Sequence, residues 1–323
     1  MGFGLVSLGR RSALFVVVAL AIGAASCRSG STPLPGSTSA ATPSPAEAWP
    51  DWALEPLYPC VSDEFAIPTR EESFNEIVSG LTLIDSQTFD MGCTQNQEPC
   101  ELDEYPVRSV LLTRDFLIGT VELAAANYQA IMGGVPYDQN VCGENVLLAW
   151  HQGAFFLNLL SDELGFQPCY WCDEYSCDLI ASPYECDGFR FPTEAEWEAA
   201  ARCGTDFRYA GTDDLDMMEE MGCTDGYLQP AGTDQANDCG LFGMSCNLPE
   251  WVNDRWADQE VGYDPGETVN PLGFPGGMLR GLRGGERWGY GYPSMAGPRI
   301  SDRGWSWEVG TRHGVRVART ADP

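Results

Sequence analysis

Cysteine is the residue type with the widest chemical repertoire in this chain, because thiols form disulfides, bind soft metals and carry out redox reactions. The sequence has thirteen cysteines, and the last is Cys246. The stretch CYWCDEYSC, from Cys169 to Cys177, together with Cys186, has a spacing that suits either disulfides or a four-cysteine zinc site. No βαβ pattern surrounds the CxxC, which argues against a thioredoxin-like role.

Other catalytic patterns are absent from the sequence. The chain has two histidines, His151 and His313, which are too few for a facial triad of metal ligands and argue against a Ser-His-Asp hydrolase. No G-x-S-x-G element occurs. The glycines of GFPGGMLRGLRGG are not followed by G-K-[ST], so a phosphate-binding loop is not expected.

The amino terminus predicts export. Arg10 and Arg11 precede an apolar run over residues 13–25, which is too short to span a bilayer comfortably and suits the core of a signal peptide. The small residues AAS then lead to Cys27, a pattern similar to a bacterial lipobox, although Ala24 stands where leucine is usual. We therefore predict a signal peptide over 1–26 and lipidation of Cys27. Plain secretion and a twin-arginine signal are the alternatives.

The segments after Cys27 predict a tethered domain in an oxidising compartment. Residues 27–50 are rich in Ser, Thr, Pro, Ala and Gly, as expected of a disordered tether. An N-terminal extension over 51–79 and one domain over 80–320 follow. If Cys27 carries lipid, twelve cysteines remain, and an even number in an exported chain favours disulfides without identifying their pairing. The net charge of −29 opposes binding of nucleic acid.

Several elements that must position any site can be predicted. Two β-prone runs flank a turn in residues 80–93, further strand-like runs extend over 107–123, and helical patterns follow over 124–134 and 147–165. The strongest helix prediction is FPTEAEWEAAARCG, where Thr193 as N-cap and Glu196 make a capping box. Residues 278–285 and 314–319 predict closing strands.

Several blocks of the sequence resemble, in the right order, those of the formylglycine-generating-enzyme (sulfatase-modifying-factor) family. The block FRFPTEAEWEAAAR is similar to the family signature R-L-P-T-E-A-E-W-E-x-A-A-R. FDMGC, DEYPVRSVLLTRDFLIGTVEL, GLFGMSCNLPEWVND, LRGLRGG and GVRVAR resemble further family blocks, and together they cover residues 80–319. The resemblance implies a single compact, disulfide-rich α+β domain, a variant of the C-type-lectin-like fold with little regular secondary structure.

The resemblance also implies which chemistry to look for. Active members oxidise a cysteine of a sulfatase peptide to formylglycine and bind copper through two cysteines just after the R-G-G strand, since soft thiolates suit Cu(I). The matching stretch here, residues 286–303, contains no cysteine. Copper is therefore not expected, and we favour a non-catalytic binding or scaffold role. The alternative is a metal-dependent oxidoreductase of the same family with an altered active site.

Two further sites follow from the resemblance. The family block that supplies calcium ligands corresponds to residues 246–251, in which Asn247 and Glu250 match and therefore predict a calcium site. Cys246 and Pro249 depart from the family residues and restrict the backbone there. A candidate binding cleft for a peptide, a glycan or an envelope protein is lined by Trp288, Tyr290, Tyr292, Trp305 and Trp307, although these aromatic residues would equally suit the core. The predicted location is the bacterial cell envelope, on the periplasmic or outer-membrane surface, with membrane contact through the N-terminal lipid only.

Overall fold

The computed structural model describes residues 57–60, 66–136, 144–218, 232–233, 235–256, 268–273, 276–277, 279–285 and 297–321. The predicted signal peptide, Cys27 and the predicted tether lie outside the described residues, as do Trp288, Tyr290 and Tyr292. Within the described part of the chain, no helix combines the length and apolar character needed to cross a bilayer.

Four α-helices and several short 3-10 turns form the helical part of the fold. The helices are α1 (Arg70–Ser79), α2 (Ala125–Met132), α3 (Trp150–Glu163) and α4 (Glu194–Arg202). Helix α2 ends at Gly133, which adopts a φ of 87°, the left-handed conformation common for a glycine that ends a helix. Helix α1 lies within the predicted N-terminal extension. It packs against α2 and adds Phe74 and Ile77 to the core.

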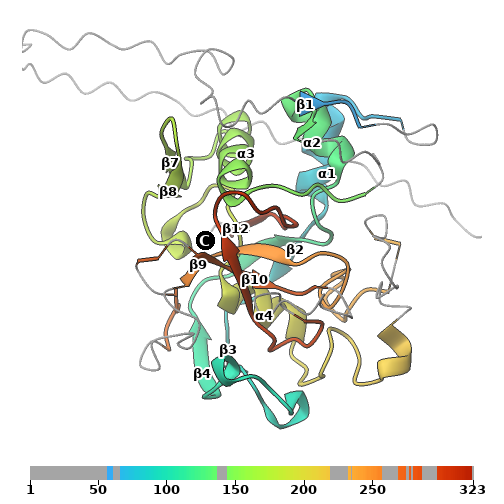
Figure 1. Cartoon of the computed structure of the whole chain (residues 1–323), viewed down its shortest axis with the longest axis vertical. Helices are drawn as coiled ribbons and strands as arrows, with labels where there is room; N and C mark the ends of the chain where they lie inside the picture. The colour runs from blue at the N-terminus through green and yellow to red at the C-terminus, as the bar shows by residue number, and fades with distance from the viewer. Residues whose placement is uncertain are drawn as a thin grey trace, which may run out of the picture. The chain divides into compact units, whose positions relative to one another are not determined.

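The strands form five small sheets (Figure 1). Two of these sheets have three strands, in the orders β12-β5-β2 and β11-β10-β9, and the remaining pairs are β1-β6, β3-β4 and β7-β8. All named pairings are antiparallel. The strands are β1 (Leu57–Tyr58), β2 (Leu81–Ile84), β3 (Gln87–Met91), β4 (Arg108–Leu112), β5 (Phe116–Gly119), β6 (Val135–Pro136), β7 (Tyr170–Cys172), β8 (Cys177–Leu179), β9 (Glu250–Trp256), β10 (Leu279–Arg283), β11 (Gly304–Trp307) and β12 (Ala318–Thr320).

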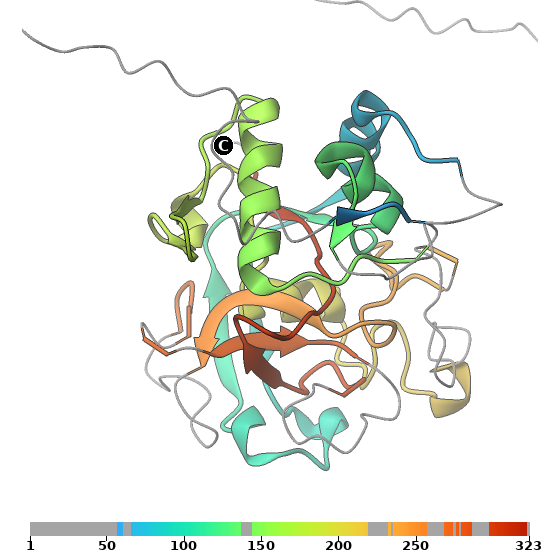
Figure 2. The ribbon, with the colours of Figure 1, turned by 45° about the horizontal axis from the view of Figure 1, so that its top comes forward.

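Two apolar clusters fill the interior. The first surrounds α2 and α3, where the rings of Trp150, Tyr170 and Phe191 contact one another. The second packs α4 against the strands, with Trp197 and Ala200 fully buried. Figure 2 shows the hairpin β7–β8 beside α3, while the sheet β9-β10-β11 crosses near the start of this helix. The Trp150 indole joins helix and sheet by donating to the Val252 carbonyl over 3.0 Å.

The disulfide prediction is confirmed among the described residues. Disulfides join Cys93 to Cys100, Cys169 to Cys186, Cys172 to Cys177 and Cys203 to Cys239. Cys60 and Cys246 are disulfide-bonded as well. The CYWCDEYSC stretch therefore forms a stapled hairpin, and the alternative zinc site is wrong because all four of its sulfurs are already in disulfides.

The predicted α+β fold with little regular secondary structure is confirmed, and the capping box of α4 forms as expected. The closing strand is shorter than the predicted 314–319. Strand β12 begins at Ala318, because Val315 and Val317 instead accept single hydrogen bonds from Leu123 and Gly119 through their carbonyls. Single main-chain hydrogen bonds therefore replace the regular strand pairing that the sequence pattern predicts for residues 314–317.

Gly281 of β10 tests how tightly the sheet packs on α4. A Cβ atom at Gly281 would lie 2.8 Å from Val252 Cγ2 and 3.0 Å from Glu194 Oε1. We expect Gly281→Ala to lower the free energy of unfolding by about 1–3 kcal/mol in urea melts, because both neighbours must shift. Gly276→Ala is the control, since a Cβ there meets no atom within 4 Å. Equal effects of the two substitutions would contradict this packing.

Candidate functional site

Buried ion pairs hold helix α4 against the sheet β9-β10-β11. The predicted site residues Glu250, Trp305 and Trp307 belong to this sheet. Glu194, Glu196 and Glu198 of α4 are all almost fully buried. Glu194 pairs with Arg303 at 2.6 Å, and Glu198 pairs with Arg283 of β10 at 2.6 Å. A buried charge is tolerated only when it is paired and hydrogen-bonded, so these contacts determine where β10 and residues 299–303 can lie.

Glu196 shows how the helix start and the ion pairs are coupled. Its carboxylate receives two hydrogen bonds from Arg190, at 2.7 and 2.8 Å, and one from the Thr193 backbone amide at 2.9 Å. The Thr193 hydroxyl in turn accepts from the Glu196 amide over 3.2 Å. The capping box that begins α4 therefore also pairs a buried arginine, and the same carboxylate does both.

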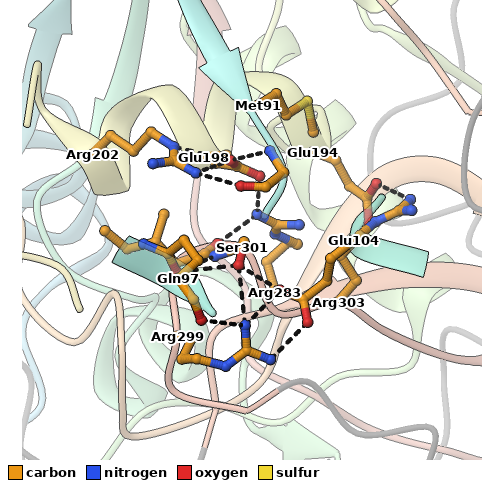
Figure 3. A network of polar contacts seen from close by, with 12 residues as sticks. Met91, Gln97, Glu104, Glu194, Glu198, Arg202, Arg283, Arg299, Ser301 and Arg303 are labelled. Carbon is orange, nitrogen blue, oxygen red and sulfur yellow. Dashed lines mark hydrogen bonds and ion pairs between the residues drawn. The ribbon is translucent and has the colours of Figure 1, made fainter. Parts of the chain in front are cut away.

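Glu198 is the centre of a second group of contacts (Figure 3). It accepts from Arg202 at 2.7 Å, from Arg283 at 2.6 Å and from the Gly92 amide at 2.8 Å. Burial alone would raise the pKa of Glu198, but the guanidiniums of Arg202 and Arg283 hold it below its ordinary value. Glu198 is therefore held as a carboxylate that joins α4, β3 and β10.

This network anchors the chain on both sides of residues 286–296, the first part of the cysteine-free stretch 286–303. Before residue 286, Arg283 donates to Glu198 and to the Ile300 carbonyl at 2.7 Å. After residue 296, Arg299 makes a two-pronged contact with Glu104, both bonds at 2.6 Å, and Ser301 also donates to Glu104 (Figure 3). Residues 286–296 lie outside the described residues. The frame around the segment is thus built from arginine and carboxylate pairs.

Asp254 of β9 lies beside this frame and is buried. It accepts hydrogen bonds from the Glu194 amide at 2.7 Å and from the Gly273 amide at 2.9 Å. Burial, together with the nearby charge of Glu194, raises the pKa of Asp254 to about 7. This carboxyl group can therefore change its protonation state near neutral pH without any exposure to solvent.

The predicted aromatic cleft is only partly within the described residues. Trp305 and Trp307 lie on one face of β11, opposite Gly281 and Leu279 of β10. Trp305 is half-buried, whereas Trp307 is 50% exposed. The other predicted members, Trp288, Tyr290 and Tyr292, are not described. Trp307 is therefore the described aromatic side chain of this set with the most surface available for a ligand.

The predicted calcium residues lie on the loop before β9 and at its first position. Asn247 adopts a φ of 73°, so the left-handed position of this loop falls on Asn247 and not on Cys246. The Asn247 side-chain amide donates to Glu122 over 2.6 Å. Glu250 accepts from Arg316, with a shortest distance of 2.6 Å, and from the Trp197 indole at 2.8 Å.

These contacts bear on whether a calcium ion fits. Calcium requires several oxygen ligands, and carboxylate oxygens are the strongest of them. Both oxygens of Glu250 already accept from Arg316, whose guanidinium balances the charge. In the described part of the chain, no three His, Cys, Asp or Glu side chains gather closely enough to hold a metal ion. An ion at Glu250 would have to share this carboxylate with Arg316, and calcium binding there stays a prediction.

The two histidines belong to different environments. His151 of α3 accepts from the Cys177 amide at 3.2 Å, and its other ring nitrogen lies 3.4 Å from Glu308. His313 packs edge-on against Trp251, and burial lowers the pKa of His313 to about 4. Both are buried, as expected for packing residues.

The sequence analysis missed the arginines that pair with the buried carboxylates. Arg190, Arg283 and Arg316 are fully buried and pair with Glu196, Glu198 and Glu250. A signal for them was present, because the sequence contains no lysine and all of its eighteen basic residues are arginines. Arginine is the residue suited to buried, two-pronged pairing with carboxylates, so an exclusive use of it indicates that paired charges are buried.

Comparison with known proteins places this geometry in a family. Residues 69–321 match the family model described as a sulfatase-modifying factor enzyme 1-like domain. The formylglycine-generating enzyme of Thermomonospora curvata is 28% identical over 266 residues, which cover 69% of this chain and 87% of that enzyme. The chaperone protein LppX of Paenibacillus barcinonensis is 25% identical over 46% of this chain and 64% of its own length. The solved structure of Treponema denticola variable protein 1 has a TM-score of 0.61 at 25% identity, covering 75% of this chain and 95% of that one.

Glu250 tests the role of the buried pairs. We expect Glu250→Gln, measured in urea melts with a calcium chelator present, to cost about 3–5 kcal/mol, because it removes the carboxylate charge that balances the buried Arg316 guanidinium. The control is Glu163→Gln, which breaks the surface pair with Arg70 and should cost less than about 1 kcal/mol. If the Glu250 variant loses stability only when calcium is supplied, the carboxylate acts through a metal ion instead.

Asp254 should give the protein a measurable pH dependence. Because its pKa is raised on folding, from 3.8 to about 7, the native state holds a proton in this window that the unfolded chain releases. Stability should therefore fall as pH rises through the window, by up to about 1.4 kcal/mol per pH unit. Asp254→Asn removes this contribution, so the stability advantage of the wild type over the variant should shrink between pH 5 and pH 8. An advantage that does not change with pH would rule out this assignment.

Proposed function

Because the chain belongs to the sulfatase-modifying factor enzyme 1-like family, we propose that it uses the family fold as a non-catalytic binding module at the cell envelope. The single observation that carries this proposal is the lack of any cysteine after Cys246. The family resemblance puts the copper-binding cysteine pair just after β10, and thiolates are the ligands that Cu(I) prefers.

The remaining cysteines offer no substitute thiolate pair in the described structure. All ten cysteines among the described residues are disulfide-bonded. A disulfide sulfur is not a thiolate, so none of these residues could bind Cu(I) without prior reduction. The family fold and its ion pairs are thus retained, while the cysteine pair that would bind copper has no counterpart after Cys246. A protein can keep a fold without its activity, since function depends on the residues of a site and not on the fold that carries them.

The proposed binding surface is the predicted aromatic cleft, of which Trp305 and the exposed Trp307 lie in the described structure. Aromatic side chains suit stacking and apolar contacts with a ligand. The name of the Paenibacillus barcinonensis relative describes that protein as a chaperone, which supports a polypeptide as the class of ligand. A glycan is the alternative that an aromatic surface also suits.

The proposed location rests on the amino terminus of the sequence. Lipidation of Cys27 and a tether over residues 28–50 would hold the domain near a membrane through the lipid alone. Disulfides fit such an oxidising compartment. Calcium remains the metal we propose for Asn247 and Glu250, in a structural role only, and no reaction step is assigned to it. The net charge of −29 favours cationic partners and opposes nucleic acid.

A direct assay separates binding from catalysis. We expect no formylglycine, by mass spectrometry, when the purified full-length protein is incubated with copper and a cysteine peptide of the sulfatase type. The Thermomonospora curvata enzyme serves as the positive control under the same conditions. Formation of the aldehyde product, or one tightly bound redox metal per chain, would overturn the proposal and favour the oxidoreductase alternative.

The binding surface has its own matched pair of variants. With carboxymethylated lactalbumin as an unfolded polypeptide probe, we expect Trp307→Ala to weaken binding by at least about tenfold, as at an interface hot spot. Trp171→Ala, which removes a comparably exposed tryptophan from the hairpin β7–β8, should leave the affinity unchanged. If maltohexaose binds and the polypeptide does not, the ligand class is glycan.

A further inference from the structure

Strand β3 has a free edge. It pairs on one side with β4, from Gln87 opposite Leu112 to Met91 opposite Arg108. The far side of β4 is covered, because Leu111 donates to the Thr268 carbonyl over 2.8 Å and accepts from the Asn270 amide over 2.9 Å. No described strand pairs with the outer side of β3. Figure 1 shows β3 and β4 at the end of the fold away from α1 and α2.

Among the described residues, this edge lacks most of the features that block pairing with another chain. Natural edge strands are protected by charged side chains, above all lysine, or by a proline, a bulge or a covering segment, and the one charged side chain of β3 is Asp90. The β3 sequence QTFDM has no basic residue or proline, and its register with β4 is regular throughout. Thr88 and Asp90 are exposed. The outward N–H and C=O groups of β3 are therefore open to an added strand.

A groove of about 590 Å³ runs along this edge, which is within the usual size of ligand sites. Its walls are residues 87–90 of β3, the loop 93–95, and Arg202 with residues 204–206 at the end of α4. The walls are rigid, because disulfides fix Cys93 to Cys100 and Cys203 to Cys239. The Thr94 hydroxyl also donates to the Asp206 carboxylate over 2.6 Å, which joins the loop to the end of the helix.

The charges of the groove point to a cationic occupant. Its exposed carboxylates are Asp90 and Asp206, the latter with a side chain that is 50% exposed. Arg202 is the guanidinium among the lining residues. It is buried and pairs with Glu198 at 2.7 Å and with Asp206 at 2.9 Å. The end of α4 also directs its negative dipole towards this region. Apolar contact is available at Val107, which is 40% exposed, and at the half-buried Phe89.

We propose that β3 binds an extended, cationic segment of a partner protein by strand addition. The partner's backbone pairs with the outer edge of β3, and alternate side chains contact the groove, where lysine or arginine meets Asp90 and Asp206. The proposal rests on the binding role proposed above, for which it names a class of partner. It concerns the edge of β3 and not the region of Trp305 and Trp307, so binding at one surface can be absent while binding at the other is present.

The probe is a fluorescein-labelled peptide, Lys-Val-Lys-Val-Lys-Val-Lys, titrated with the full-length protein and followed by anisotropy at low salt. We expect saturable binding to one site per chain. Two further peptides test the two parts of the interaction. The sequence with glutamate in place of lysine should not bind, because it would face the two carboxylates. A version N-methylated on alternate residues should bind at least about tenfold more weakly, since it lacks main-chain donors.

Protein variants locate the site. Asp90→Lys places a positive charge on the exposed side of the edge, and we expect it to weaken peptide binding by at least about tenfold. Glu71→Lys, at an exposed position of α1, makes the same change in net charge elsewhere and should alter the affinity less than about twofold. Hydrogen–deuterium exchange should show that the peptide protects amides of residues 87–91.

The outcomes separate this proposal from the proposed function. Absence of binding, equal binding of the N-methylated peptide, or equal effects of the Asp90 and Glu71 variants would each overturn strand addition at β3. A peptide whose binding is weakened by Trp307→Ala and not by Asp90→Lys would support the aromatic surface while overturning this inference. Binding that survives Trp307→Ala and is lost with Asp90→Lys supports it.

Discussion

The structure depends on the pairing of three glutamates of α4 with arginines from elsewhere in the chain. Glu194, Glu196 and Glu198 are buried on a helix of nine residues, and each contacts at least one guanidinium. A carboxylate removed from water is costly unless it is paired, so the arginines can occupy only a few positions. The placement of β10, of residues 299–303 and of the end of β3 follows from these pairs. Glu250, the first residue of β9, is buried and paired with Arg316 in the same way.

This frame explains how the fold can form although no cysteine follows Cys246. The residues on either side of 286–296 are fixed by this frame, because Arg283 and Arg299 are held by Glu198 and Glu104. The described scaffold on both sides therefore depends on these ion pairs. The family match over residues 69–321 and the lack of cysteine after Cys246 are compatible for this reason. Disulfides add a second, independent support for a fold that has little regular secondary structure.

The two proposed binding surfaces differ in physical character. The region of Trp307 offers aromatic area, which suits apolar and stacking contacts. The outer side of β3 offers main-chain groups beside carboxylates, which suit an extended cationic chain. Both lie on a strongly acidic protein that has no lysine, in which many arginines are already engaged with buried carboxylates. Attraction of basic partners therefore follows from the net charge of the protein. The edge of β3 adds main-chain hydrogen-bonding groups that fix the position and direction of a bound chain.

Local chemistry was sufficient for the elements that depend on neighbours in sequence. Thr193 and Glu196 determine the start of α4, and Gly133 ends α2, because each depends on groups within a few residues. The cysteine spacing of the hairpin β7–β8 left disulfides and a zinc site open, and the structure decided for disulfides. The family blocks also identified the fold, and the sequence alone showed that the thiol pair is missing. Only the tertiary structure decided that Glu250 pairs with Arg316, that Glu194 meets Arg303, and that β3 has an open edge beside a groove. These features join residues far apart in the chain, and the partner of a buried charge depends on how the whole chain folds around it and not on its neighbours in sequence.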